Sequence, residues 1–150
     1  MAQPEPNPTF QIPRLAIIDD AEFDQMLYAR LIERTGIVGE TLCFFSAEEA
    51  LTYFEAPDAQ PVDVILLDIN MPGMSGFDFL EHITENKSAD YAEIVIVMLT
   101  TSLNPLDVER ASTFDLVKDY IHKPLEEQHL DDIAQLLLQM RGNPDDRKSD

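Results

Sequence analysis

The stretch VDVILLDINMPGMSG, residues 62–76, is the part of the sequence that decides the fold prediction. Five of its first six residues are apolar, a composition typical of a strand that is buried on both faces. The run ends at a carboxylate, Asp68, and the chain then turns through Asn70 and the Met-Pro-Gly sequence of residues 71–73. The pattern therefore predicts a buried parallel strand that fixes an acid at its own end, with a turn shaped around that acid.

The rest of the chain alternates between short apolar runs and segments with helical spacing. The predicted strands are residues 14–19, 41–45, 62–67, 94–99 and 116–121. The predicted helices are residues 22–35, where Phe23, Met26, Leu27 and Leu31 recur at helical spacing, then 46–55, 75–86, a short one from Pro105, and 125–140. Such alternation implies an α/β fold, a doubly wound five-stranded parallel sheet with helices on both faces.

Polar or ionisable side chains follow four of the five predicted strands. They are Asp19 and Asp20 at the first strand, Asp68 at the third, Thr100 and Thr101 at the fourth, and Lys123 at the fifth. Because ligands of open parallel sheets bind at the carboxyl ends of the strands, we expect these side chains to lie close together.

The expected cluster has a definite chemistry. Three carboxylates in one place repel one another, and a divalent cation relieves that repulsion. All-oxygen ligands without histidine or cysteine favour Mg²⁺ or Ca²⁺. A carboxylate beside such an ion and a lysine can attack phosphorus and form an acyl phosphate, with Lys123 neutralising the phosphoryl oxygens and Thr100 donating a hydrogen bond to one of them.

Composition and charge limit the class of protein. The 150 residues are 45% hydrophobic, which is enough for one folded domain with a sizeable core. Of the 19 net negative charges, 18 lie within residues 14–140, because the first 13 residues add only Glu5 and the last ten balance. An acidic body repels phosphate backbones, which argues against nucleic-acid binding and favours basic proteins or divalent cations as partners.

The two ends of the chain differ from this body. Four prolines predict an extended, mobile arm over residues 1–13, and residues 141–150 read as a polar tail after a domain at 14–140. The sequence shows neither a secretory signal nor an apolar run long enough to span a membrane. Cys43 is the single cysteine; it is expected in the core and suits a reducing cytoplasm, where we expect the protein to act.

Taken in order, four motifs resemble a known family. They are Asp19-Asp20 after the first strand, LLDINMPGMSG around Asp68, VMLTTS around Thr100, and DYIHKP around Lys123. The chain resembles a response-regulator receiver domain of the single-domain CheY-like kind over residues 14–140. The resemblance implies a flavodoxin-like (β/α)5 fold with strand order 2-1-3-4-5.

The same resemblance implies a role for each residue that matches the family pattern. Asp68 resembles the phosphoacceptor. Asp20, Asp68 and the backbone carbonyl of Asn70 resemble direct Mg²⁺ ligands, and Asp19 resembles the acid that holds metal-bound water. Thr100 resembles the switch hydroxyl and Lys123 the phosphate-binding lysine, whose bond to Pro124 is usually cis in the family.

Two positions leave a choice open. Tyr120 resembles the aromatic residue whose rotamer reports the switch, although it also fits a half-buried aromatic of an edge strand without a switching role. Thr101 departs from the family, where Ala, Gly or Ser commonly follows the switch hydroxyl. A side chain of this size beside the pocket is expected to slow the attack of water on the acyl phosphate.

The resemblance implies a stand-alone response regulator of a two-component phosphorelay. It would accept phosphate from a histidine kinase or a histidine phosphotransfer protein and catalyse only its own phosphorylation and dephosphorylation. The few residues after the last predicted helix leave no room for an output domain, so the output is expected from the face formed by residues 103–140, through a protein target or a phosphorylation-dependent homodimer. The alternatives are a haloacid-dehalogenase-type phosphatase, which has an acid where this chain has Asn70, and a pseudo-receiver that binds without phosphorylation.

Overall fold

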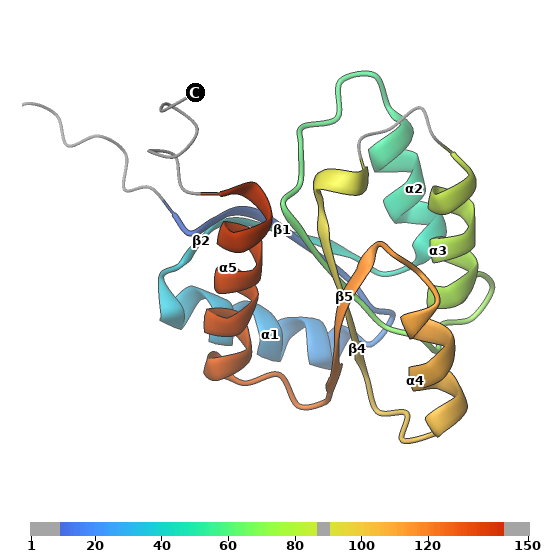
Figure 1. Ribbon diagram of the computed structural model, residues 1–150. Helices are drawn as coiled ribbons and strands as arrows, with labels where there is room; N and C mark the ends of the chain where they lie inside the picture. The colour runs from blue at the N-terminus through green and yellow to red at the C-terminus, as the bar shows by residue number, and fades with distance from the viewer. Residues whose placement is uncertain (1–9, 87–90, 143–150) are drawn as a thin grey trace, which may run out of the picture.

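The computed structural model describes residues 10–86 and 91–142. They form one parallel sheet in the order β2-β1-β3-β4-β5, as the resemblance implied (Figure 1). The strands are β1 (Ile12–Ile18), β2 (Val38–Phe44), β3 (Val64–Leu67), β4 (Val95–Thr100) and β5 (Val117–His122). The helices are α1 (Glu22–Thr35), α2 (Ala47–Glu55), α3 (Gly76–Glu85), α4 (Pro105–Ser112) and α5 (Glu127–Arg141). The doubly wound fold class is therefore confirmed.

Helices cover both faces of the sheet, and each face has its own core (Figure 1). Alternate residues of the three central strands point to opposite faces, so Ile65 and Leu67 of β3 pack beneath α2 and α3, while Val64 and Leu66 pack beneath α1 and α5. All four residues of β3 are buried, which is why the strand shows a continuous apolar run instead of an alternating pattern.

Local signals account for where the helices begin. Ser75 caps α3, with its hydroxyl accepting from the backbone N–H of Asp78 while the Asp78 carboxylate accepts from the Ser75 N–H. Ser46 caps α2 by accepting from the N–H of Glu49. These caps fix the starts of the helices next to the carboxyl edge of the sheet.

The first strand begins earlier than predicted. β1 starts at Ile12, so Pro13 lies within a strand. Pairing of β1 with β3 starts only at Leu15, and Pro13 therefore occupies a stretch where β1 has a single neighbour and a lost N–H donor costs little. Residues 1–9 of the predicted arm and residues 143–150 of the predicted tail lie outside the described residues.

Helix α1 has the predicted bounds but an unexpected orientation. The apolar residues Phe23, Met26 and Leu27 that predicted it are exposed, Phe23 by 65%. The buried positions are Gln25, Tyr28 and Ile32. The Gln25 side-chain amide donates to the backbone carbonyls of Ile17, Asp19 and Phe44, so a polar residue joins α1 to the ends of β1 and β2.

Two further features of the described residues bear on the sequence analysis. Cys43 on the edge strand β2 is exposed, and the expectation that it belongs to the core is wrong. The pleat turns its side chain away from the neighbouring Phe44, which is buried. Among residues 10–86 and 91–142, no helix is long and apolar enough to cross a membrane.

Candidate functional site

The carboxyl edge of the sheet brings the predicted acids and the lysine together. Asp19, Asp68 and Lys123 are each the first residue after a strand, and Asp20 follows Asp19. One carboxylate oxygen from each of the three aspartates lies within 4.8 Å of the other two. The backbone N–H groups of Asp19 and Asp68 donate to the ends of neighbouring strands, at 3.0 Å in both cases, so the sheet holds these residues rigidly.

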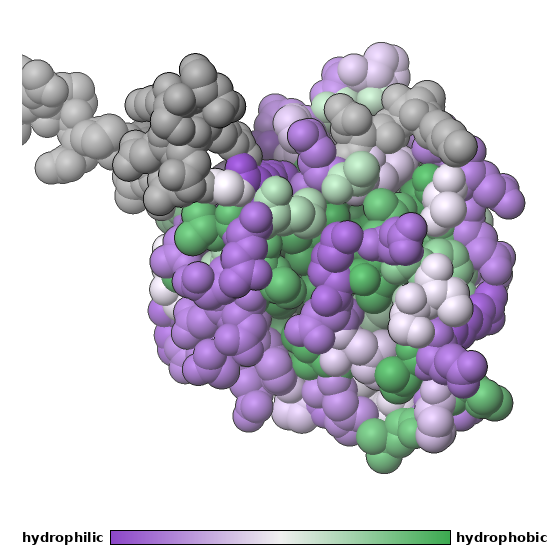
Figure 2. Space-filling view, in the orientation of Figure 1, coloured by the Kyte–Doolittle hydropathy of each residue, from purple (hydrophilic) through white to green (hydrophobic). Residues whose placement is uncertain are grey.

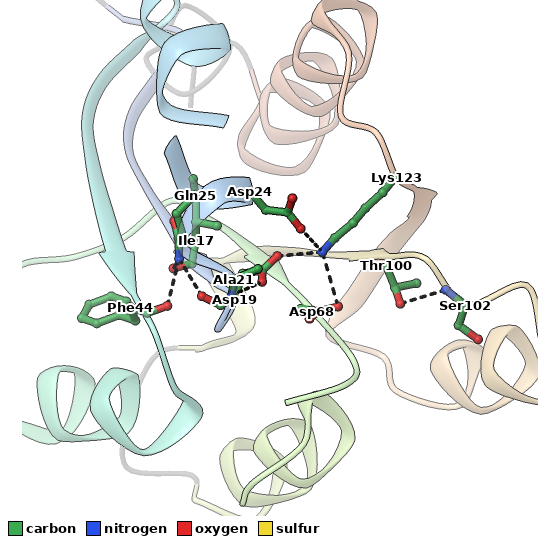
Figure 3. A network of polar contacts seen from close by, with 10 residues as sticks. All are labelled: Ile17, Asp19, Ala21, Asp24, Gln25, Phe44, Asp68, Thr100, Ser102 and Lys123. Atoms are coloured by element: carbon green, nitrogen blue, oxygen red, sulfur yellow. Dashed lines mark hydrogen bonds and ion pairs between the residues drawn. The ribbon is translucent and has the colours of Figure 1, made fainter. Parts of the chain in front are cut away.

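Lys123 lies at the centre of this cluster (Figure 3). Its ammonium nitrogen Nζ is 2.8 Å from Asp19 Oδ2, 3.1 Å from Asp24 Oδ2 and 3.9 Å from Asp68 Oδ1. The lysine backbone N–H donates to the carbonyl of Thr100 at 2.8 Å. The bond from Lys123 to Pro124 is cis, which confirms the expectation from the family.

Burial and charge set the electrostatics of the site. Burial raises the pKa of Asp68 to about 6; the negative charge of Asp19 adds to this effect, and the attraction of Lys123 opposes it. Burial by itself would lower the pKa of Lys123, but hydrogen bonds to Asp19 and Asp24 and the charge of Asp68 raise it. The lysine is therefore an ammonium ion. Its single positive charge does not neutralise the nearby carboxylates of Asp19, Asp24 and Asp68.

The backbone turn around Asp68 explains the glycine that follows it. A Cβ atom at Gly76 would lie 2.3 Å from the carbonyl oxygen of Asp68, so any larger residue would push the turn away. The Gly76 N–H also donates to the carbonyl of Ile69 at 2.8 Å, which closes the loop between β3 and α3. The predicted ligand Asn70 is exposed in this loop. The role of its carbonyl stays a prediction.

Thr100 and Tyr120 both form hydrogen bonds with the backbone of Ser102. Thr100 is the last residue of β4 and its side chain is fully buried. Its hydroxyl oxygen accepts from the N–H of Ser102 at 3.1 Å, and the Tyr120 hydroxyl donates to the carbonyl of the same Ser102 at 3.3 Å. Thr101 is exposed beside them. The structure thus connects the predicted switch residues through Ser102, the last residue of the VMLTTS motif, to which the sequence analysis gave no role.

The donor set fits a hard divalent cation. The described cluster offers carboxylate oxygens from three residues. The raised pKa of Asp68 reflects first its burial and then the negative charge of Asp19, which the attraction of Lys123 opposes. Mg²⁺ prefers such oxygen ligands and keeps several waters, which suits a cluster with one exposed member, Asp20. Asp19, Asp20 and Asp68 are the residues that would hold it.

Sequence reasoning missed three residues on α1 that surround this site. Asp24 pairs with Lys123, Gln25 fastens the helix to the strand ends, and Tyr28 lies against the lysine, with Nζ 5.9 Å from its ring centroid. Tyr28 comes four positions after Asp24 and three after Gln25, a spacing that makes it a neighbour of both on the helix surface. That signal was outweighed by the more apolar set on the opposite side of α1.

The fold and the site together define a doubly wound α/β protein with an acidic, lysine-containing pocket at the carboxyl edge of its sheet. The sequence profile of the response regulator receiver domain matches residues 15–135, and the chain belongs to that family. This membership separates it from the haloacid-dehalogenase-type phosphatases considered above.

Individual relatives agree with the family assignment. The chain is 29% identical over 129 residues to the sensory/regulatory protein RpfC of Xanthomonas campestris pv. campestris, a match that covers 85% of this chain and 17% of RpfC. A two-component response regulator from Cytophaga hutchinsonii has a TM-score of 0.78 at 26% identity, covering 85% of this chain and 98% of the other. A response regulator receiver protein from Dyadobacter fermentans has a TM-score of 0.73 at 28% identity, with 87% and 98% covered. Since the chain spans only a small part of RpfC, the stand-alone organisation expected from the sequence remains a prediction.

Proposed function

We propose that this receiver domain accepts a phosphoryl group on Asp68 in a Mg²⁺-dependent reaction, within a cytoplasmic two-component phosphorelay. The donor is a histidine kinase or a histidine phosphotransfer protein, and the phosphorylated domain signals by binding another protein. The observation that carries the proposal is the convergence of three aspartates and Lys123 at one edge of the sheet. The only chemistry ascribed to the domain itself is its own phosphorylation and dephosphorylation.

Each side chain of the site has a part in the proposed reaction. A carboxylate oxygen of Asp68 attacks the phosphorus of the phosphohistidine, the P–N bond breaks, and its electron pair stays on the imidazole nitrogen. The product is an acyl phosphate on Asp68. Bound Mg²⁺ would neutralise charge on the phosphoryl oxygens. The nitrogen Nζ of Lys123 is 3.9 Å from Asp68 Oδ1, and we expect it to pair with one of those oxygens, while the buried Thr100 hydroxyl is expected to donate to another.

The exposed apolar side of α1 is suited to the docking of the phosphohistidine protein. Phe23 and Met26, with Cys43 and Phe45 of the neighbouring β2 edge, line a shallow groove. Phe23 comes three residues after Asp20, and we therefore expect a protein donor that reaches Asp68 to contact this groove as well. Phe23→Ser should slow phosphotransfer from a protein donor and leave phosphorylation by a small phosphodonor unchanged. Equal slowing with both donors would contradict this assignment.

The output is proposed on the face formed by α4, β5 and α5. Thr100 precedes this segment, Lys123 lies within it between β5 and α5, and Tyr120 of β5 is connected to Thr100 through Ser102. In Figure 2, which has the orientation of Figure 1, hydrophilic side chains cover much of α5 while apolar atoms are visible at the start of α4. Leu103 and Leu106 are exposed there by 77% and 69%, and they offer apolar contact area to a protein target or to a second receiver.

The proposal is tested by intact-mass measurement after incubation with a small phosphodonor. Wild-type protein should gain one phosphoryl group when Mg²⁺ is present and none when a chelator removes it. Asp20→Ala should require more Mg²⁺, because the substitution removes a direct ligand. Asp68→Asn should gain nothing. A gain that persists in Asp68→Asn would refute the assignment of the acceptor, and a wild type that never gains mass would favour the pseudo-receiver alternative.

A further inference from the structure

Asp24 accepts a hydrogen bond from Lys123, although the proposed phosphoryl transfer gives Asp24 no role. It lies in the first turn of α1, outside the three-aspartate cluster, and its Oδ2 atom accepts from Lys123 Nζ at 3.1 Å. Figure 3 shows the ammonium group between Asp19, Asp24 and Asp68. Asp24 is therefore a fourth acid, one that contacts the lysine and has no part in the predicted metal cluster.

The hydrogen bonds of Lys123 limit what the lysine can do at rest. An ammonium group has three N–H donors, and two of them are within hydrogen-bond distance of Asp19 and Asp24. Asp68 Oδ1, at 3.9 Å, is beyond that distance. The centroid of the Tyr28 ring is 5.9 Å from the same nitrogen. The remaining N–H is the one donor that a phosphoryl group on Asp68 can take without loss of these contacts, so a second hydrogen bond to that group has to replace one of them.

The two acceptors differ in how easily they can be released. The Asp19 side chain is 2% exposed, and its other oxygen accepts from the N–H of Ala21 at 2.9 Å, so losing the lysine would leave a buried carboxylate poorly compensated. The Asp24 side chain is 33% exposed and can be rehydrated by solvent. Asp24 is therefore the acceptor that the lysine can leave at the smaller cost.

We propose that Asp24 is a positioning residue that restrains Lys123 in the resting state and competes with the phosphoryl group for its ammonium. The inference rests on the proposed function, because it concerns the acid that receives the phosphoryl group. The proposal predicts an effect of removing Asp24 that is opposite to the effect expected if Asp24 only supported the structure of the site. Removing a competitor should strengthen the binding of a phosphoryl mimic at Asp68, whereas removing a support should weaken it.

The test is a titration with beryllofluoride at saturating Mg²⁺, followed by amide chemical shifts. Asp24→Ala should bind the mimic about two- to fivefold more tightly than wild type, the range expected for a partly exposed ion pair. Asp24→Asn, which keeps a neutral acceptor, should show a smaller change in the same direction and also covers the case in which the alanine variant fails to fold. Glu22→Gln is the matched control, because it removes one exposed negative charge from the same turn of α1 without touching Lys123.

The outcomes separate this inference from the function on which it rests. Tighter binding in both Asp24 variants, with Glu22→Gln equal to wild type, supports the competition. Equal or weaker binding in the Asp24 variants overturns it, while the wild type still binds the mimic and the proposed function stands. Equal tightening in Glu22→Gln would also overturn it, since the effect would then come from net charge alone. A wild type that does not bind beryllofluoride overturns the proposed function itself.

Discussion

Asp68→Asn should stabilise the fold at neutral pH in the absence of divalent cations. Burial and the charge of Asp19 raise the pKa of Asp68 from 3.8 to about 6, so ionised Asp68 is disfavoured in the folded state relative to the unfolded chain. One pKa unit corresponds to about 1.4 kcal/mol, so the cost of the charge has an upper limit of about 3 kcal/mol. An uncharged asparagine of similar shape avoids this cost, and we expect a gain of about 1–3 kcal/mol in the free energy of unfolding.

The pH dependence of this gain follows from the direction of the shift. Between pH 3.8 and about 6 the folded protein binds more protons at Asp68 than the unfolded chain, so the contribution of Asp68 to stability falls as the pH rises through that window. Below the window Asp68 is protonated in both states and costs nothing. The variant should therefore match the wild type near pH 4, gain its advantage up to about pH 6, and keep it at higher pH.

Urea unfolding at a series of pH values measures this difference directly. Chelator must be present throughout, and a second series with Mg²⁺ should stabilise the wild type more than the variant, because the variant has lost one carboxylate of the cluster. Asp78→Asn is a suitable control, since Asp78 lies in an exposed cap in which hydrogen bonds lower its pKa. An Asp68→Asn protein that is less stable than wild type at pH 7.5 without metal would refute the electrostatic reasoning.

Two further predictions concern the phosphorylated state. Thr101→Ala should shorten the lifetime of the acyl phosphate, because the exposed threonine beside Thr100 is expected to obstruct the attacking water; an unchanged or longer lifetime in a phosphate-release assay would remove the steric argument. Beryllofluoride should shift amide resonances across residues 103–140, because Thr100 and Tyr120 both form hydrogen bonds with Ser102, the residue just before that segment. The coupling is expected at about 1–3 kcal/mol, and a silent segment with changes confined to the acidic loops would exclude the switch.

The sequence predicted the order of the elements and the placement of the acids for a clear physical reason. Strands of a parallel sheet are buried on both faces and read as continuous apolar runs, so the residue after each run marks the carboxyl edge. Asp19, Asp68 and Lys123 each directly follow a strand and were found in this way. Thr100, which the sequence placed after the run, is instead the last residue of β4.

The parts that sequence reasoning missed depend on packing. The helical spacing of apolar residues predicted α1, yet Phe23 of this set is exposed and the polar Gln25 is buried. Gln25 can be buried because its side-chain amide donates to three backbone carbonyls at the strand ends. The contact of Asp24 with Lys123 joins residues 99 positions apart and has no local signature. The connection of Thr100 with Tyr120 through Ser102 was missed because it uses the backbone N–H and carbonyl of Ser102, which the pattern of side chains in a sequence does not reveal.

The measurement that tests the central claim most directly is the chemical location of the phosphoryl group. Borohydride reduces an aspartyl phosphate to homoserine, so treating the phosphorylated protein and sequencing its peptides by mass spectrometry identifies the acceptor. The account predicts homoserine at position 68, dependent on Mg²⁺ during phosphorylation. Homoserine at position 19, 20 or 24, or a stable phosphoryl group that borohydride does not reduce, would contradict the account.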